Sequence, residues 1–514
     1  MTTSQPDITI NILPATETIS NEPQRVLFIG QQLPAGSAVS GVLQEDIQND
    51  KAEDGLFGKD SFLAHMIRAG RVVNKNTQFD AIGLDDDGSA VDATGNIVFA
   101  GTATETGELE VVIGSAKNAS FTVVVTNGDT ATVVGDALEA LIAADTESLV
   151  VAANTTGNVL LTAKNGGLEG NTIGLRVKGT VAGITHSVTG MASGAGNPSL
   201  TNLFDVIQGR RYQTIIWPAT FTLDDLTTEL DARFNVTNDV LDGHGMVAQT
   251  DSLANHKTTG AALNSRSLTL LALKSISETS FAGPTLLEIP AVVAALMGSI
   301  RALRLTPGTN LSQVVITPFG ARDQFGGPAL ATLPYFNTPF PQLVPEDTGK
   351  TWTLLEVEEL KEVGISTIST NVAGNSVIAD EILTTRKTDD ASNPETTFKF
   401  LNAKDAASVA REFFLNNLKS RFVQSRLTEG AIVPGRSMAN AETVQAECLR
   451  LYRILSESDF VITEAGETSL QFFADNLVVR IIKIEGKVEI DMVVLIVTQL
   501  RTILATLQIS FSAN

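Results

Sequence analysis

Arg25-Val26-Leu27-Phe28-Ile29-Gly30 is the stretch that decides the fold, because its apolar run ends in a glycine turn, as a short buried strand does. Residues 62–73 follow with apolar side chains at helical spacing, and Asp60 or Ser61 stands where an N-cap is needed. Residues 79–84 then have the composition of a second strand. Strand, helix and strand in this order begin an α/β unit.

The same alternation returns after residue 198, and it predicts a mainly parallel sheet that is covered on both faces. The expected helices and strands are 200–207 helix, 212–217 strand, 223–234 helix, 245–249 strand, 252–263 helix, 267–273 strand, and a longer apolar helix at 286–303 with Pro290 in its first turns.

Residues 90–197 interrupt this pattern and are rich in Gly, Thr, Val and Ala. Short β runs separated by turn signals, with one helix at 132–144 among them, predict an inserted, mostly β domain. The runs are 109–113, 121–125, 149–153 and 159–163, and 193–198 is the expected exit linker.

After a proline-rich linker at 306–350, residues 351–501 predict an α+β domain. Its expected elements are a helix at 353–363, strands at 364–370 and 376–383, a helix at 403–426 and a helix around Cys448. Apolar residues at every second position from 482 to 492 predict a further strand.

Strand-like segments at the two ends of the chain, 1–24 and 502–514, are predicted to be extended β arms. Each carries an alternating aliphatic face, formed by Ile8, Ile10 and Ile12 at one end and by Ile503, Leu507, Ile509 and Phe511 at the other. Two alternatives stay open for both arms: they complete a sheet within one subunit, or they add strands to sheets of neighbouring subunits. The predicted fold class is thus α/β multidomain, with a mainly parallel core at 25–89 and 198–305, the insertion, the C-terminal α+β domain and the arms.

Length and charge limit the possible functions. A chain of 514 residues is expected to form two to four domains, and a formal charge of −22 argues against nucleic acid or an anionic membrane as the main partner. The single cysteine, Cys448, rules out an internal disulfide framework and lies on an apolar helical stripe, so we expect a buried thiol. We expect neither a signal peptide nor a membrane span, since no apolar run reaches about 18 residues.

No motif predicts catalysis or a cofactor. His65, His186, His244 and His256 lie on separate predicted elements, where surface or cap positions are expected rather than metal ligands. Residues 55–60 lack the spacing of a phosphate loop, and we interpret them as a turn and helix cap. Residues 85–89, three aspartates followed by Gly-Ser, lack the glutamate of an EF-hand and predict a solvated turn.

Three segments together resemble the tail sheath protein of contractile-tailed bacteriophages, in its Mu-like branch. They are the glycine-serine turn and helix at 57–66, the β insertion with Asn127-Gly128-Asp129-Thr130, and the C-terminal run from 441–448 through 470–479 to Gln499-Leu500-Arg501 and the last strand. The chain departs from the family at 495–498, Leu-Ile-Val-Thr, where a Pro-Asp-x-x-Asn approach is usual, and it has few aromatic residues.

The resemblance implies a structural, self-assembling subunit that is not an enzyme and needs no cofactor. Such subunits form stacked rings or a helical polymer around a tail tube protein, and the arms lace neighbours into a mesh. Baseplate and tail terminator proteins are further implied partners, with no nucleic acid and no direct membrane insertion. Contraction drives the tube through the host envelope during genome delivery. The implied location is the virion tail, assembled in the host bacterial cytoplasm.

Two other classes of function stay open at this point. One is a multidomain α/β enzyme or carbohydrate-binding protein, with a site at the C-terminal ends of the parallel strands. The other is a different virion protein, such as a tube or baseplate component. The sequence therefore directs attention to the arms, to the sheet edges that accept them and to the ends of the parallel strands.

Overall fold

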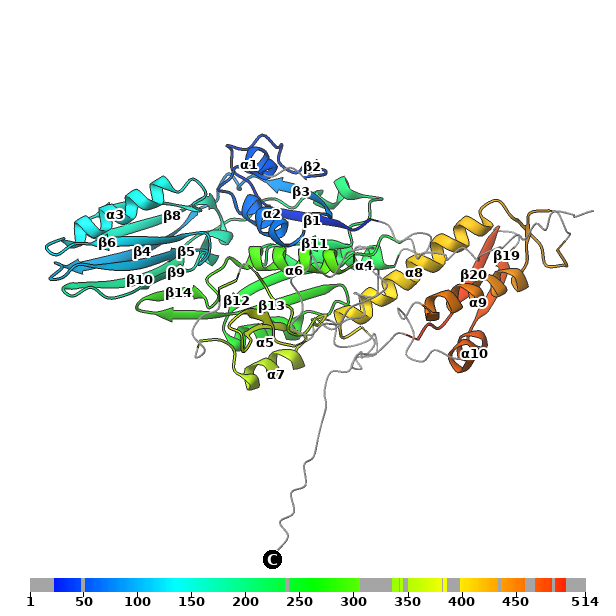
Figure 1. The fold of residues 1–514 in the computed structure, drawn as a ribbon. Coiled ribbons are helices and arrows are strands. Elements are labelled where there is room, and N and C mark those ends of the chain that lie inside the picture. Colours follow the sequence, from blue (N-terminus) through cyan, green and yellow to red (C-terminus); the bar gives the residue numbers. More distant parts are fainter. Residues whose placement is uncertain are drawn as a thin grey trace, which may run out of the picture. The chain divides into compact units, whose positions relative to one another are not determined.

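The computed structural model describes residues 23–47, 51–235, 240–305, 335–341, 343–344, 350–380, 382–385, 398–432, 436–457, 467–482 and 486–495. It is a mixed α/β structure (Figure 1). The described residues divide into a larger unit between Pro23 and Ser408 and a smaller unit between Val409 and Leu495. Apart from residues 23 and 24, both predicted arms lie outside the described residues.

A parallel sheet forms the centre of the larger unit, as the alternation of helices and strands predicts. Neighbouring strands pair in parallel through the series β3 (Gln78–Leu84), β1 (Arg25–Gln31), β11 (Thr214–Ile216), β12 (Gly245–Asp251) and β13 (Leu268–Glu278). Two further strands extend it: β2 (Leu43–Gln44) is antiparallel to β3, and β15 (Ser366–Thr370) is parallel to β13 and pairs with β16 (Ser376–Ile378).

Helices cover both faces of this sheet (Figure 1). Val26 and Phe28 belong to one buried cluster and Leu27 and Ile29 to another, as expected for a strand whose two faces are both covered. The first cluster includes residues of α2 (Phe62–Val73) and α6 (Pro290–Leu305). The second includes residues of η2 (Leu203–Ile207), α4 (Leu223–Phe234) and α7 (Leu354–Glu362), with α5 (Leu253–Ala262) packed beside it.

Several predicted boundaries are confirmed and others are wrong. The bounds of α2 and α4 are those predicted, and the Ser61 hydroxyl caps α2 by accepting the Ala64 N–H at 3.2 Å. A short helix, α1 (Ala52–Phe57), lies in the segment that we expected to be a turn. Helix α6 starts at Pro290 rather than at residue 286, because proline suits the first helical position and disfavours helix in the residue before it.

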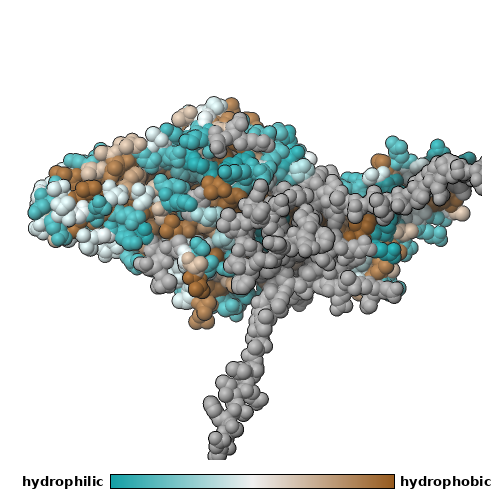
Figure 2. Space-filling view, viewed as in Figure 1, coloured by the Kyte–Doolittle hydropathy of each residue, from teal (hydrophilic) through white to brown (hydrophobic). Residues whose placement is uncertain are grey.

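The insertion is a sandwich of two sheets, and one of them is continuous with the central sheet. Strand β13 runs on into a hairpin with β14 (Phe281–Pro284), which pairs with β9 (Leu175–Lys178), then β5 (Gly107–Ile113) and β6 (Ser120–Val125). The second sheet has the order β10 (Ile184–Ala192), β4 (Asp92–Gly101), β8 (Asn158–Gly166) and β7 (Val150–Thr155), and α3 (Ala131–Ala144) packs with both. In Figure 2, hydrophobic and weakly polar residues mix with hydrophilic ones over the insertion, at the left.

Side chains also join the insertion to the central sheet. Asp86 accepts the Gly166 N–H and the Gln31 side-chain amide, each at 2.6 Å, and the Asn165 side chain donates to the Gln32 carbonyl at 2.9 Å. Burial raises the pKa of the Asp86 carboxyl from its usual value. The expected solvated turn at 85–89 is therefore wrong for Asp86, whose carboxylate binds strand ends of two sheets.

The long helix α8 (Leu401–Phe422) passes from the larger unit to the smaller unit along the chain. It ends four residues before the predicted position, and Arg426–Leu427 form β17, which pairs with β18 (Met438–Ala439). The smaller unit continues with α9 (Ala441–Glu457), α10 (Glu467–Asp475), β19 (Val478–Ile482) and β20 (Lys487–Asp491). Because β15 joins the central sheet, no break in that sheet marks the expected domain boundary at residue 351.

The prediction of a single strand over residues 482–492 is wrong, because the chain reverses its direction within this stretch. β19 and β20 form an antiparallel hairpin in which Ile482 lies opposite Lys487, and Gly486 has a φ of 63° that glycine adopts without steric cost. The turn preserves the alternation of apolar residues, so period two in the sequence did not reveal it.

Two buried carboxyls make the joint between insertion and core sensitive to pH. Glu169 accepts a hydrogen bond from the Thr220 hydroxyl, and Glu288 accepts one from the Ser115 hydroxyl at 2.7 Å. Each pair links the insertion to the core. Burial raises the pKa of both carboxyls from 4.5 to about 7, so the folded protein favours their protonated forms.

We expect the free energy of unfolding to fall as the pH rises from about 4.5 to 7. In this window the unfolded chain binds fewer protons at these two sites than the folded chain, and each site contributes on the order of 3 kcal/mol. Urea unfolding at pH 5 and pH 7.5 should show a much smaller loss for the double variant Glu169→Gln, Glu288→Gln than for the parent. The exposed Glu108→Gln is the control, and equal losses in all three proteins would contradict the expectation.

Candidate functional site

All seven residues predicted to form inter-subunit faces, Ile8, Ile10, Ile12, Ile503, Leu507, Ile509 and Phe511, lie outside the described residues. The assignment of these side chains to subunit contacts therefore stays a prediction. The described residues do show which parts of the molecule precede and follow the arms along the chain. These parts are β1, which starts two residues after Pro23, and the hairpin of β19 and β20.

The hairpin has one aliphatic face and one largely charged face. Its register places Val479 opposite Ile490 and Ile481 opposite Val488, and all four side chains are only half-buried. On the other face Arg480 pairs with Asp491 at 2.7 Å. Within the described part of the chain neither strand has a second partner, so both edges of this two-stranded sheet offer unpaired backbone groups. A two-stranded sheet is marginal by itself, and further strands would stabilise it.

Aromatic packing gives the smaller unit a firm core beside this hairpin. Phe473 stacks on Tyr452, with ring centroids 4.0 Å apart, and on Phe414 at 6.0 Å. Cys448 lies in the same unit on the buried stripe of α9, and burial raises the pKa of its thiol to about 11. The prediction of a buried thiol is confirmed.

A buried ion pair fixes the first turns of α8 in the larger unit. Arg301 of α6 and Asp405 of α8 are 3% and 1% exposed, and the Arg301 guanidinium donates to Asp405 Oδ1 from Nη2 at 2.5 Å and from Nε at 3.2 Å. Its Nη1 donates to the Gln213 carbonyl at 2.5 Å and to the Thr214 hydroxyl at 2.7 Å, at the start of β11. The Arg301 guanidinium thus connects its own helix, α6, to β11 and to α8.

A second buried cation reinforces this point of attachment. Lys404 donates from Nζ to the Gly243 carbonyl at 2.5 Å, just before β12, and burial lowers the pKa of its ammonium to about 8. Asp242 accepts hydrogen bonds from Arg211 at 3.2 Å and from the Ser408 hydroxyl. Such groups are costly to bury unless they are paired, so this network holds α8 in one position.

This network was missed from the sequence, although a signal was present. Arg301 and Arg304 stand in an otherwise apolar helix whose side chains are all buried. Arg304 lies over the ring of Tyr335 at 3.8 Å from the guanidinium carbon to the ring centroid. Charges on a helix without a solvent face predict buried partners, but the sequence does not show that Asp405, 104 residues later, is that partner.

The C-terminal ends of the parallel strands carry a cavity of about 580 Å³, where an enzyme or carbohydrate-binding protein would have its site. It lies between the central sheet and the insertion and is lined by residues such as Thr220, Gln249 and Thr250. Glu169 is the one titratable side chain among the described residues that line it. A lone carboxyl beside hydroxyl groups, with no second acid or base among the described lining residues, does not complete a catalytic arrangement.

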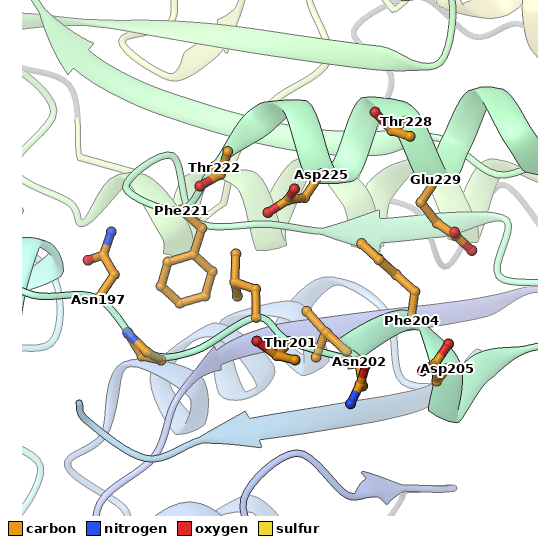
Figure 3. Close-up of a pocket in the computed structure, with 13 residues that line it drawn as sticks. Asn197, Thr201, Asn202, Phe204, Asp205, Phe221, Thr222, Asp225, Thr228 and Glu229 are labelled. Atoms are coloured by element: carbon orange, nitrogen blue, oxygen red, sulfur yellow. The ribbon is translucent and has the colours of Figure 1, made fainter. Parts of the chain in front are cut away.

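A second hollow, of about 680 Å³, lies between α4 and the segment 197–205 (Figure 3). Phe204 and Phe221 point into it, and Asp205, Asp225 and Glu229 lie along its rim (Figure 3). Glu229 pairs with Arg233 at 2.6 Å, and Asp205 accepts from the Gln208 amide at 2.9 Å. The carboxylates of Glu229 and Asp205 therefore serve local contacts.

The histidines are more buried than we predicted. His244 and His256 are fully buried, and their Nε2 atoms lie 2.8 Å from the Thr269 hydroxyl and 3.2 Å from the Leu273 carbonyl, so surface or cap positions are wrong for both. Within the described ranges no group of His, Cys, Asp and Glu could hold a metal ion. No helix in these ranges has the length and apolar character needed to cross a membrane.

Comparison with known proteins identifies relatives of one kind. The chain is 26% identical over 458 residues to the Mu-like prophage FluMu tail sheath protein of Haemophilus influenzae, which covers 87% of this chain and 86% of that protein. No family model matches the chain.

Two solved structures are similar at lower identity. The sheath tail protein from Desulfitobacterium hafniense has a TM-score of 0.46 and 11% identity, covering 95% of this chain and 96% of that one. The helical sheath of the anti-feeding prophage in its contracted state has a TM-score of 0.44 and 12% identity, covering 99% of both chains.

The sequence relationship spans most of both proteins and confirms the resemblance drawn from the three segments. It gives no support to the alternative of a multidomain α/β enzyme or carbohydrate-binding protein. The chain is a homologue of this Mu-like prophage tail sheath protein.

Proposed function

We propose that this chain is the self-assembling subunit of a contractile tail sheath, which polymerises around a tail tube and contracts to drive that tube through the host cell envelope. The observation that carries the proposal is the 26% identity to a Mu-like tail sheath protein over 87% of the chain. The proposed role is structural and needs neither catalysis nor a cofactor. The proposed location is the virion tail, after assembly in the host bacterial cytoplasm.

The proposed partners are other copies of this chain, a tail tube protein, and baseplate and tail terminator proteins. Copies would form stacked rings or a helical polymer. In this arrangement residues 90–197 are the outer domain and residues 351–501 include the inner, tube-facing part. Negative-stain microscopy of the purified protein tests the proposal directly, since long hollow polymers or rings are expected and discrete small oligomers would contradict it.

In this proposal the arms add strands to the β19–β20 hairpin of neighbouring copies. The hairpin supports this role because its strands have unpaired edges within the described chain and a half-buried aliphatic face of Val479, Ile481, Val488 and Ile490. Burying one large apolar side chain fully contributes roughly 1.5–3 kcal/mol, so the four of the C-terminal arm contribute on the order of 6–12 kcal/mol. Ordering about a dozen residues costs roughly 1–2 kcal/mol each, which leaves one arm near break-even. Joint use of both arms then makes assembly favourable.

Motion of a subunit during contraction must pass through its rigid parts. We propose that the buried network at Arg301, Asp405 and Lys404 transmits this motion. It can do so because it fixes the first turns of α8 to α6 and to the start of β11 and β12. The helix α8 then leads along the chain to the smaller unit that contains the hairpin.

Removing the arms should abolish assembly without unfolding the protein. Truncation after Gln499 deletes the aliphatic face of the C-terminal arm and should give a folded monomer, and truncation of residues 1–13 should weaken or block polymer formation. Sedimentation velocity and circular dichroism provide the measurement, and deletion of Ala513 and Asn514 alone is the control. Long polymers from the chain truncated after Gln499 would refute the arm model, whereas an unfolded product would favour a strand within the subunit.

Breaking the buried ion pair should destabilise the larger unit. Asp405→Asn leaves the Arg301 guanidinium buried without its counter-charge, and we expect a loss of about 3–5 kcal/mol in the free energy of unfolding. Thermal and urea unfolding measure it, with Asn416→Ala on the exposed side of α8 as the control. The paired replacement Arg301→Met, Asp405→Leu should recover much of the loss. A single variant as stable as the parent would show that the pair does not hold α8.

A further inference from the structure

No element of the described part of the chain covers the outer face of the four-stranded sheet in the insertion. Alternate residues of each strand point inward; they are buried in β4 and β8, as Ile97, Phe99, Val159 and Leu161 are, and buried or half-buried in β7 and β10. The residues between them point outward and are exposed or half-exposed. The register of β10, β4, β8 and β7 places thirteen of them on one surface: Thr94, Asn96, Val98, Ala100, Val151, Ala153, Thr155, Asn158, Leu160, Thr162, Thr185, Ser187 and Thr189. We call this surface the neutral face.

None of the thirteen side chains carries a charge, although the chain as a whole has a formal charge of −22. Charged residues make up 18% of this chain, so about two would be expected among thirteen positions. The charged residues on this side, Asp92 and Lys164, lie beyond the thirteen, at the end of the sheet nearest the core, where Lys164 pairs with Asp60 at 2.7 Å.

The other sheet of the same sandwich provides the contrast. Its outer surface carries Glu108 and Glu110 on β5 and Arg176 and Lys178 on β9. Glu110 lies opposite Lys178, and Glu108 lies opposite Val124 on β6. Both sheets come from one insertion and both have an outer side, so composition alone does not explain why only one of them is free of charge.

We propose that the neutral face is a contact surface between copies of this chain in the assembled polymer, an inference that rests on the proposed sheath function. Two copies of an acidic chain repel each other unless the surfaces that meet are free of like charges, and the neutral face meets this condition. The neutral face has no carboxylate that could bind a basic partner. A sugar would find no aromatic ring to stack on, although such rings usually line binding sites of that kind.

The size of the neutral face fits a contact that acts only within an assembly. Four strands spaced about 4.8 Å apart, with about seven residues at 3.3 Å each, make a surface of roughly 20 Å by 20 Å. This is about half of the 800 Å² per partner that a stable complex usually buries. The face is therefore too small to hold two copies together in dilute solution, but it strengthens contacts between copies that the arms already tether.

Glutamate substitutions on the two sheets of the full-length chain test the proposal. Val151 on β7 and Val124 on β6 are matched, because both are strand residues on outer surfaces with exposures of 53% and 59%. We expect Val151→Glu and Leu160→Glu to raise the critical concentration for polymerisation about tenfold or more, and Val124→Glu to change it less than about twofold. Light scattering and electron microscopy give the readout, and equal thermal unfolding midpoints exclude misfolding.

The outcomes separate this inference from the function on which it rests. If the parent chain forms no polymer, the proposed function fails and the inference fails with it. If the parent polymerises and Val151→Glu and Leu160→Glu behave like Val124→Glu, the sheath function stands and the neutral face is not a contact between copies. Unchanged polymerisation in all three variants would leave that face to a partner of another kind.

Discussion

The buried pair of Arg301 and Asp405 is the interaction on which the organisation of the larger unit depends. A guanidinium and a carboxylate lose several kcal/mol each when they leave water, and this loss is offset only while their geometry is maintained. The pair therefore acts as a constraint: α6, the start of β11 and the first turns of α8 must keep one arrangement. A purely apolar contact could shift at a lower cost in free energy. The two charges therefore fix the relative position of these elements more than they stabilise the fold.

The continuous sheet imposes a second constraint, because β13 belongs both to the parallel core and, through β14, to the sandwich of the insertion. An insertion attached only by two linkers could rotate freely. Here a shared sheet, the Asp86 contacts and two buried carboxyls at the joint resist rotation. A force on the outer strands is therefore transmitted to the core through backbone hydrogen bonds. This continuity argues that the larger unit moves as one body.

Local pattern made part of this structure predictable. Apolar spacing and a serine cap defined α2, and the alternation of helices and strands predicted the parallel sheet that β1, β3, β11, β12 and β13 form. Local pattern did not identify the partners in pairings between distant residues: β14 with β9, β15 with β13, and Arg301 with Asp405. The hairpin at Gly486 was missed because its turn keeps the apolar residues in phase. The roles of the arm residues near both ends of the chain stay predictions, because none of those residues is among those that the structure describes.

The rigid interior and the modest contacts at the surface have complementary roles in a structure that must change shape. An assembly held by one large interface would have to break all of it at once to rearrange. In the proposed assembly, arms near energetic break-even and a neutral face of roughly half the usual size are contacts that can be released and remade one at a time. The many copies of these contacts along a polymer together supply the binding free energy of the assembly. Each contact that forms raises the effective concentration at which the linked contacts form. The costly, inflexible interactions lie inside the subunit, where Arg301 and Asp405 keep the geometry that such weak contacts need in order to meet.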